Sequence, residues 1–368
     1  MKFEASHYDT IKWNPHVVEP GEIFNKLRGT RKIKIGDKKE IVLRSPCRID
    51  VGLLDYSALK FTDNNNYKAG EMSFAGNAYT YVKVKLINDS SKIKINSERP
   101  VFVKHYALLV KNATNYKKGF EIQTKAHPYR HIGFGSSAII AETVAYAINE
   151  LLGRPLSFRE LRKLVAYNFV EESDSNKNKL FPGASTGGSF NTIKKGGFVI
   201  TSSESEEIFH DSIPENMYFI VGTPKVNVAG PEASETDVNI MGWERHNERV
   251  NAAKTCLWIL MEIMPYWVKG DFKKVGNAFY NYTFFGGKGM QMLLYRSDLH
   301  GILFQLKEAG LEGGWMTSAG PSLVVFTQDV KKKNKAIQIF KKRKCKTVIV
   351  KPDNRGIIEV DNKIFNKI

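Results

Sequence analysis

Cysteine and long hydrophobic runs are both scarce in this sequence. Its 368 residues include three cysteines, none of them at CxxC spacing, which argues against a disulfide framework and a structural zinc site. No run of about 18 uninterrupted apolar residues occurs, as a membrane-spanning helix would need. The N-terminal stretch MKFEASHYDTIKWNP lacks the apolar core of a signal peptide. We therefore expect a soluble protein of the reducing cytoplasm that does not contact membranes.

Acidic residues are few relative to basic ones. The chain has 38 Asp and Glu residues against 55 Lys and Arg, a formal net charge of +17, which favours anionic partners. The densest basic runs are 331–333 and 341–344, and the second ends a helical pattern, where lysines suit the helix dipole. No aromatic RNA-binding motif, zinc finger or basic-helix dimer accompanies them. We therefore expect a small anionic substrate rather than nucleic acid.

The composition supports a folded chain with two domains. Hydrophobic residues make up 42% of the sequence, enough for a core, and the length suits two domains of ordinary size. The acidic, serine-rich stretch 202–211 is the best candidate for a boundary. We predict an N-terminal extension at 1–40, an N-terminal domain at 41–205 and a C-terminal domain at 206–368.

Hydrophobic periodicity predicts the main elements of these domains. Alternation of polar and apolar residues predicts strands over 40–43, 78–87, 92–95 and 118–125. A helical period predicts one helix over 137–152 and a second over 156–172, with Ser157 and Glu160 forming a capping box at its start. In the second half we predict strands over 217–224, 313–327 (with a turn inside) and 346–352, and helices over 244–264, 271–282, 299–309 and 335–344. This order is typical of an α+β domain with an antiparallel sheet.

The segment HIGFGSSA, residues 131–138, is the most informative stretch because it directly precedes the strongest predicted helix. Glycines let the backbone bend so that its N–H groups converge, and a helix N-terminus adds unpaired N–H groups and partial positive charge. Two serine hydroxyls can bind phosphate oxygens or a magnesium ion. The motifs GxxxxGK[ST] and GxGxxG are both absent. The segment indicates an anion site of the type that ATP kinases use, and a purely structural helix cap is the alternative.

Two further segments combine charge or small residues with apolar surroundings. In the stretch 46–56, PCRIDVGLLDY, the charged residues Arg48, Asp50 and Asp55 interrupt an apolar strand, which is costly unless the charges are paired or used. The stretch 316–322, MTSAGPS, is a small-residue turn between two apolar runs. Each has a structural alternative, a salt-bridged strand end and a tight hairpin respectively.

Taken in order, these three segments resemble the three motifs of the GHMP kinase superfamily, which includes galactokinase, homoserine kinase and mevalonate kinase. The segment HIGFGSSA resembles the phosphate loop of that family, usually written PxxxGLGSSA, and the resemblance covers roughly residues 41–350. It implies the GHMP kinase fold, an α+β architecture with an N-terminal domain like ribosomal S5 domain 2 and a C-terminal ferredoxin-like domain. It also implies that ATP binds between these domains with Mg²⁺.

A second similarity is to β-ribofuranosylaminobenzene 5′-phosphate synthase, a relative with the same fold that transfers a phosphoribosyl group. It is carried by the segments CRIDVGLLD, KKGGFVI, MYFIVGTP and LMEIMPYWVKGDFKKVGNAF. The loop of that synthase typically reads GLGSGTQ, whereas Ser136, Ser137 and Ala138 have the kinase spelling here. We therefore interpret the chain as a relative of the synthase with kinase chemistry.

The resemblance implies a role for each matching residue. The ATP phosphates would be held by Gly133, Gly135, Ser136, Ser137 and Ala138. The catalytic residues would be Arg48, Ser137 and Asp174, the last as the nearest candidate for the aspartate base that many members carry, because the loop FPGASTGGSFN contains no acidic residue. Magnesium would be held by Ser137, Glu171 and Glu172, at the end of the second helix. The expected substrate-binding residues are Asp50, Asp55, His131, Ser185, Thr186, Ser318 and Gly320.

These residues predict an ATP-dependent kinase that phosphorylates a hydroxyl group of an anionic metabolite. Within the family, mevalonate or a mevalonate phosphate of the isoprenoid precursor pathway fits the positive charge best, and a homodimer is the default assembly. Two alternatives remain: a phosphoribosyl transferase like the synthase, and a catalytically inactive ligand-binding relative.

Overall fold

The computed structural model describes most of the chain, namely residues 33–55, 69–87, 91–130, 132–172, 180–182, 185–226, 251–318 and 320–368. Two predicted site residues, His131 and Asp174, lie outside these ranges, so their roles stay predictions. A search of the described helices for one that could serve as a membrane span finds none.

The larger of two main sheets is built around two long strands, β1 and β2. It has seven strands, in the order β13-β1-β2-β4-β3, with β7 attached to β2 and β8 to β7. Their bounds are β1 Glu40–Gly52, β2 Glu71–Ile87, β3 Ile93–Asn96, β4 Gly119–Lys125, β7 Phe198–Thr201, β8 Glu207–Asp211 and β13 Ile358–Glu359. Every pairing is antiparallel except that of β3 with β4. Strand β1 is buried along most of its length on both faces, and β2 alternates buried with more exposed residues only from Asn77 onward.

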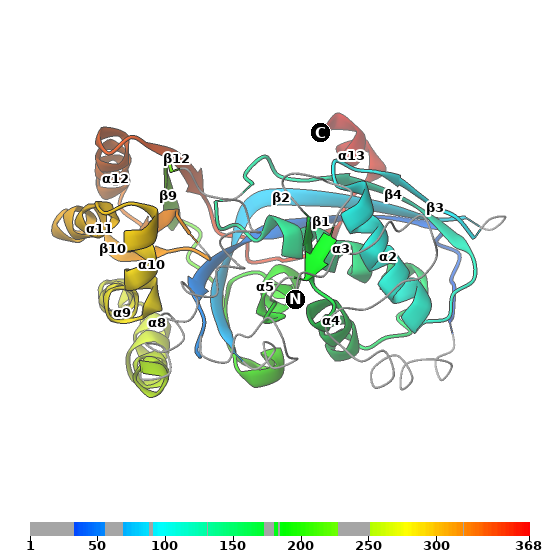
Figure 1. The fold of residues 1–368 in the computed structure, drawn as a ribbon, viewed down its shortest axis with the longest axis horizontal. Helices are drawn as coiled ribbons and strands as arrows, with labels where there is room; N and C mark the ends of the chain where they lie inside the picture. Colours follow the sequence, from blue (N-terminus) through cyan, green and yellow to red (C-terminus); the bar gives the residue numbers. More distant parts are fainter. Residues whose placement is uncertain are drawn as a thin grey trace.

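Helices pack beside this sheet, as Figure 1 shows. Their bounds are α2 Pro100–Ala113, α3 Ser136–Leu151, α4 Phe158–Tyr167, α5 Gly188–Lys195 and α13 Asn362–Lys367. The helix α3 is buried on most of its surface, and its buried residues include the charged Glu142 as well as Ile139 and Val144. Because the backbone N–H of Arg48 donates to the carbonyl of Phe134 at 3.2 Å, the loop ahead of α3 lies against β1.

The smaller main sheet lies at the other end of the molecule and carries its own helices (Figure 1). Its four strands have the order β10-β11-β9-β12, with bounds β9 Tyr218–Pro224, β10 Glu312–Met316, β11 Leu323–Thr327 and β12 Cys345–Val350. Its helices are η4 Ile259–Ile263 (a π-helix), α8 Met264–Val268, α9 Phe272–Phe285, α10 Gly287–Tyr295, α11 Leu299–Glu308 and α12 Val330–Lys342. Along the chain the strands come in the order β9, β10, β11, β12. In the sheet, β11 lies between β10 and β9, and β12 pairs with the other edge of β9. This is the ferredoxin-like arrangement, so the predicted α+β fold is confirmed.

Aromatic side chains fill the junction between the two sheets. The ring of Phe74 on β2 lies 4.4 Å from that of Phe198, 5.0 Å from that of Phe219 on β9 and 5.9 Å from that of Trp315 on β10, between centroids. The indole N–H of Trp315 also donates to the backbone carbonyl of Asp50 at 2.7 Å. One continuous core therefore joins β1 and β2 to the smaller sheet.

The C-terminal segment returns to the larger sheet, where β13 pairs with β1. The ammonium of Lys125 on β4 donates to the carbonyl of Phe365 on α13 at 2.7 Å. Strand β8, which follows residue 206, also pairs in the larger sheet. The predicted division into 1–40, 41–205 and 206–368 stays a prediction, and sheet pairing groups β8 and β13 with the first of its two domains.

One predicted helix ends earlier than expected. Helix α4 starts with the predicted capping box of Ser157 and Glu160 but stops at Tyr167, and residues 170–172 form the short strand β5 (Val170–Glu172), paired with β6 (Leu180–Pro182). The prediction that Glu171 and Glu172 stand at a helix end is therefore wrong. The β-branched Val170 is fully buried and pairs as a strand, so tertiary packing overrides the helical period. Sequence reasoning assigned no element to several segments, which form α2, α5, α10, α13, β6, β7, β8 and β13.

Candidate active site

The loop before α3 has the conformation that an anion site needs. Gly133 and Gly135 both adopt left-handed backbone angles, with φ of 82° and 66°, which glycine adopts without steric cost. Gly135 is the N-cap of α3, and no side chain caps the helix there. The first N–H groups of an α-helix have no partner inside the helix, so those of Ser136, Ser137 and Ala138 are directed out of its N-terminus. The predicted phosphate-binding residues therefore stand together at one helix end.

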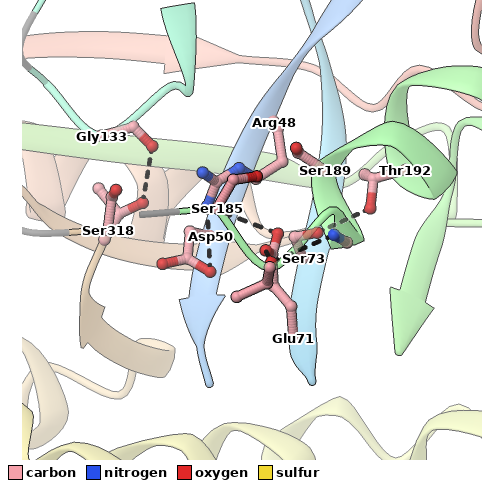
Figure 2. Close-up of polar contacts among 12 residues, drawn as sticks. Arg48, Asp50, Glu71, Ser73, Gly133, Ser185, Ser189, Thr192 and Ser318 are labelled. Atoms are coloured by element: carbon pink, nitrogen blue, oxygen red, sulfur yellow. Dashed lines mark hydrogen bonds and ion pairs between the residues drawn. The ribbon is translucent and has the colours of Figure 1, made fainter. Parts of the chain in front are cut away.

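The turn after β10 supports this loop from the side. The hydroxyl of Thr317 donates to the carbonyl of Gly133 at 3.1 Å, and a Cβ atom added at Gly133 would lie 2.3 Å from Cγ2 of Thr317. The predicted residues Ser318 and Gly320 lie in the same turn; Figure 2 shows Ser318 beside Gly133. The carbonyl of Ser318 accepts from the ammonium of Lys288. Thr317, which the sequence did not single out, is thus the residue that joins the third motif to the second.

A pair of carboxylates faces the first turn of α3. The hydroxyl of Ser137 donates to Oε2 of Glu171 at 2.7 Å and accepts from Nη1 of Arg99 at 2.8 Å. Arg99 also donates to Oε2 of Glu172 at 2.7 Å, and Arg130 lies 3.7 Å from the same oxygen. Burial raises the pKa of Glu171, although Arg99 and Ser137 oppose this shift. The strand β5 therefore brings Glu171 to Ser137 and both predicted carboxylates to Arg99, a cation that the sequence did not predict.

These residues fit the Mg²⁺ that the fold family implies. Oε1 of Glu172 is buried and has no hydrogen-bond partner among the described residues, so it is available as an oxygen ligand. The donor set of two carboxylates and one hydroxyl consists of hard oxygen atoms, as Mg²⁺ prefers. Among the described residues no group of three or more His, Cys, Asp or Glu side chains could hold a metal. Mg²⁺ usually completes its shell with phosphate oxygens and water, so a small protein donor set is sufficient.

Arg48 lies under the phosphate loop and is surrounded by acids. A Cβ atom added at Gly135 would lie 3.1 Å from its Nε, and its Nη1 lies 3.2 Å from Oδ1 of Asp50 and 3.6 Å from Oε1 of Glu71. Its side chain is only 12% exposed. Figure 2 shows the guanidinium directed toward Asp50 and Glu71. Sequence reasoning predicted Arg48 and Asp50, which share one strand, but missed Glu71, which comes from β2.

The buried carboxylate of Glu142 completes this acidic cluster, and hydroxyl groups hold both Glu142 and Glu71. The hydroxyl of Thr186 donates to Oε2 of Glu71, and the hydroxyl of Ser189 donates to Oε1 of Glu142. Burial raises the pKa of Glu71, and it raises the pKa of Glu142 well above its usual range. Glu142 had a signal in the sequence, because it is an acidic residue inside the apolar stretch AIIAETVAYAI. Glu71 had none, since it stands at the start of an ordinary strand.

The remaining predicted substrate residues have more local roles. Ser185 accepts from the backbone N–H of Gly187 at 3.2 Å, and Thr186 accepts from that of Gly188 at 3.1 Å, so both satisfy the start of α5. The backbone N–H of Asp55 donates to the carbonyl of Ala69 at 2.9 Å. Thr186 reaches the Arg48 cluster through its hydrogen bond to Glu71. Their predicted contacts with substrate stay predictions.

Known proteins share this fold along nearly their whole length. Residues 101–174, which span α2, α3, α4 and β5, match the family described as the GHMP kinases N terminal domain. The chain is 22% identical to beta-ribofuranosylphenol 5′-phosphate synthase of Archaeoglobus fulgidus over 339 residues, 86% of this chain and 99% of that protein.

Two solved structures superimpose well. Homoserine kinase from Cytophaga hutchinsonii has a TM-score of 0.60 at 17% identity and covers 88% of this chain and 98% of its own. Mevalonate diphosphate decarboxylase from Enterococcus faecalis has a TM-score of 0.59 at 16% identity, over 88% and 99%. The resemblance carried by the three motifs is thereby confirmed, and the chain has the GHMP kinase fold.

Proposed function

We propose that the protein is an ATP-dependent phosphotransferase that transfers the γ-phosphoryl group to a hydroxyl of a small metabolite. The observation that carries this proposal is the contact of Ser137, in the first turn of α3, with Glu171 at 2.7 Å. It joins a helix N-terminus suited to phosphate with a carboxylate suited to magnesium. Phosphoryl transfer depends mainly on positioning and charge neutralisation, and this arrangement supplies both.

Each group at the site has a distinct part in this proposal. The N–H groups of 136–138 would bind the phosphates of ATP, and Ser137, Glu171 and Glu172 would hold Mg²⁺. When bound, that ion supplies positive charge to the phosphate oxygens. Arg48 places a guanidinium next to Gly135, where it would stabilise charge on the transferred group. The structurally similar mevalonate diphosphate decarboxylase from Enterococcus faecalis binds ATP, which supports ATP as the nucleotide of this proposal.

The finer proposal for the acceptor is a hydroxy acid of the mevalonate type. The net charge of +17 supports an anionic substrate, and a mevalonate diphosphate decarboxylase shares the fold. Arg48 is already paired with Asp50 and Glu71. We therefore propose that other cations hold the acidic group of the acceptor, and that its hydroxyl lies toward Arg48.

The direct test is ADP release from Mg-ATP with a panel of mevalonate, its phosphates and homoserine. Ser137→Ala should lower kcat/KM by about 10²-fold, as loss of one preorganised donor does. The matched control is Ser203→Ala, at an exposed serine in the short 3-10 helix η3 (Ser203–Ser205), which should keep the activity of the unaltered protein. Equal activity of both variants would remove the phosphate loop from the proposed mechanism.

Phosphoribosyl transfer is the second candidate, because the match to the Archaeoglobus fulgidus synthase covers 99% of that protein. It predicts binding of phosphoribosyl pyrophosphate and release of carbon dioxide, without consumption of ATP. Activity in this assay alone would replace the kinase proposal. Tight binding of Mg-ATP with turnover in neither assay would favour the inactive ligand-binding relative.

A further inference from the structure

The cluster around Arg48 contains an unusual concentration of unsatisfied polar atoms. Four buried atoms there have no hydrogen-bond partner among the described residues: Arg48 Nε, Asp50 Oδ1, Glu71 Oε1 and Glu142 Oε2. Burying such atoms without a hydrogen bond costs free energy, and ion pairing with Arg48 offsets part of that cost for Asp50 and Glu71. Buried polar groups in native proteins are nearly always hydrogen-bonded, and exceptions usually mark a function or a bound molecule. The cluster therefore contains both a donor and acceptors whose hydrogen-bonding capacity the described residues leave unused.

Glu71 is the member of this cluster whose carboxylate is held at both ends. Its Oε2 accepts from the hydroxyl of Thr186, and its Oε1 lies 3.6 Å from Nη1 of Arg48. Behind it, a Cβ atom added at Gly188 would lie 2.8 Å from the Cβ of Glu71, so only glycine at this position leaves room for the Glu71 side chain. The unsatisfied oxygen is thus fixed on the side of Arg48, and Arg48 contacts the phosphate loop at Gly135.

We propose that Glu71 is the base that accepts the proton of the acceptor hydroxyl. This inference rests on the proposed kinase function. As the O–H bond breaks, its proton passes to Oε1 of Glu71. The hydroxyl oxygen then forms its bond to the γ-phosphorus, and the bond from that phosphorus to the bridging oxygen breaks, so that ADP leaves. The role replaces the one predicted for Asp174, which lies outside the described residues.

The charged groups that face Glu71 are consistent with a base. Strand β1 contributes Arg48 and Asp50, helix α3 contributes Glu142, and the loop before α5 contributes the hydroxyl of Thr186. Burial and Asp50 raise the pKa of Glu71, while Arg48 and hydrogen bonds from Thr186 and Ser73 lower it, and the net shift is upward. A base is most effective when its pKa approaches the working pH, and the upward shift moves the carboxylate in that direction.

The experiment compares Glu71→Gln with Glu40→Gln in ADP release across pH 5 to 9. Glu40 is a matched control because it is also a carboxylate of the larger sheet paired with a cation, Lys83 at 3.2 Å. For Glu71→Gln we expect kcat to fall by about 10²-fold or more, loss of the acid limb of the kcat profile, and a Kd for Mg-ATP within about twofold of the unaltered protein. Glu40→Gln should keep both the rate and the limb.

Two outcomes would overturn the role of Glu71 while leaving the kinase intact: an acid limb retained in Glu71→Gln, or a kcat within about threefold of the unaltered protein. Loss of the limb in Asp174→Asn but not in Glu71→Gln would assign the base to Asp174 instead. If Glu71→Gln fails to fold, Glu71→Asp keeps a carboxylate beside Arg48 but shortens the side chain by one methylene, so kcat should fall by about tenfold or more; an unchanged kcat in Glu71→Asp would contradict the proposal. Unaltered protein that releases no ADP with any acceptor or with water would overturn the kinase function itself, and this inference with it.

Discussion

At the scale of single residues, the imidazole of His127 lies behind the phosphate loop, with its ring centroid 6.0 Å from that of Phe134. Its Nδ1 accepts from the backbone N–H of Tyr129 at 3.3 Å. Burial lowers the pKa of His127 to about 4 from its ordinary value of 6.5. Between these values the unfolded chain binds more protons than the folded one, so the free energy of unfolding falls as pH decreases from 6.5 toward 4.

We predict that His127→Phe flattens this pH dependence. The variant removes the titrating group and keeps a ring in the cavity. Urea unfolding at pH 7.5, 6 and 5 should show a smaller loss of stability on acidification than in the unaltered protein. The control Phe134→Leu disturbs the same ring contact without removing a titrating group, and it should keep the original slope. Equal slopes in all three proteins would contradict the buried, neutral state of His127.

Gly135 gives a second prediction at this scale. Its φ of 66° is strained for any side chain, and a Cβ there would meet Nε of Arg48 at 3.1 Å. Gly270 has a similar φ of 71° but nothing within 4 Å of an added Cβ. Gly135→Ala and Gly270→Ala should each lower the free energy of unfolding by about 1 kcal/mol. Only Gly135→Ala should also weaken Mg-ATP binding, measured by calorimetry. Equal Mg-ATP affinity of both variants would contradict the proposal that Gly135 and Arg48 belong to the nucleotide site.

At the scale of secondary structure, helix α4 depends on its capping box. The hydroxyl of Ser157 accepts from the backbone N–H of Glu160, and the carboxylate of Glu160 accepts from the backbone N–H of Ser157. Ser157→Ala should lower the free energy of unfolding by about 1 kcal/mol, measured by urea unfolding. The control Ser203→Ala, at an exposed serine, should change it by less than about 0.5 kcal/mol. A similar loss in both would mean that the cap contributes nothing.

At the scale of the whole molecule, helix α9 contacts the strand that carries Arg48. The hydroxyl of Tyr282 donates to the carbonyl of Leu53, just beyond β1, at 3.0 Å. The hydroxyl of Tyr280, two residues earlier, is buried without a partner among the described residues. Tyr282→Phe leaves a buried carbonyl unpaired and should cost about 1 kcal/mol or more, whereas Tyr280→Phe should be neutral or stabilising. Thermal unfolding of the two variants measures the difference. A larger loss of stability in Tyr280→Phe than in Tyr282→Phe would contradict a stabilising role for the hydrogen bond between Tyr282 and Leu53.

Much of the candidate site could be predicted from the sequence because its signals are local. Gly133, Gly135 and Ser137 are neighbours along the chain, and the two glycines by themselves indicate a backbone with positive φ angles. Arg48 and Asp50 are two residues apart on one strand, and alternation alone puts them on the same face. The capping box of α4 is likewise a pattern of four residues. All of these features depend only on residues that are close in the sequence, so no contact between distant segments is needed to predict them.

Only the tertiary structure decided which distant groups meet these local ones. Glu71 reaches Arg48 because β2 pairs antiparallel with β1, so that Asp50 stands opposite Ser73; a register is set by the burial of whole strand faces, which no single residue reveals. Glu171 reaches Ser137 because Val170 packs as a strand where the periodicity predicted a helix. Local sequence thus determined the glycine-containing loop before α3 and the start of that helix. The carboxylates around that loop were decided by long-range pairing and burial, which depend on the chain as a whole.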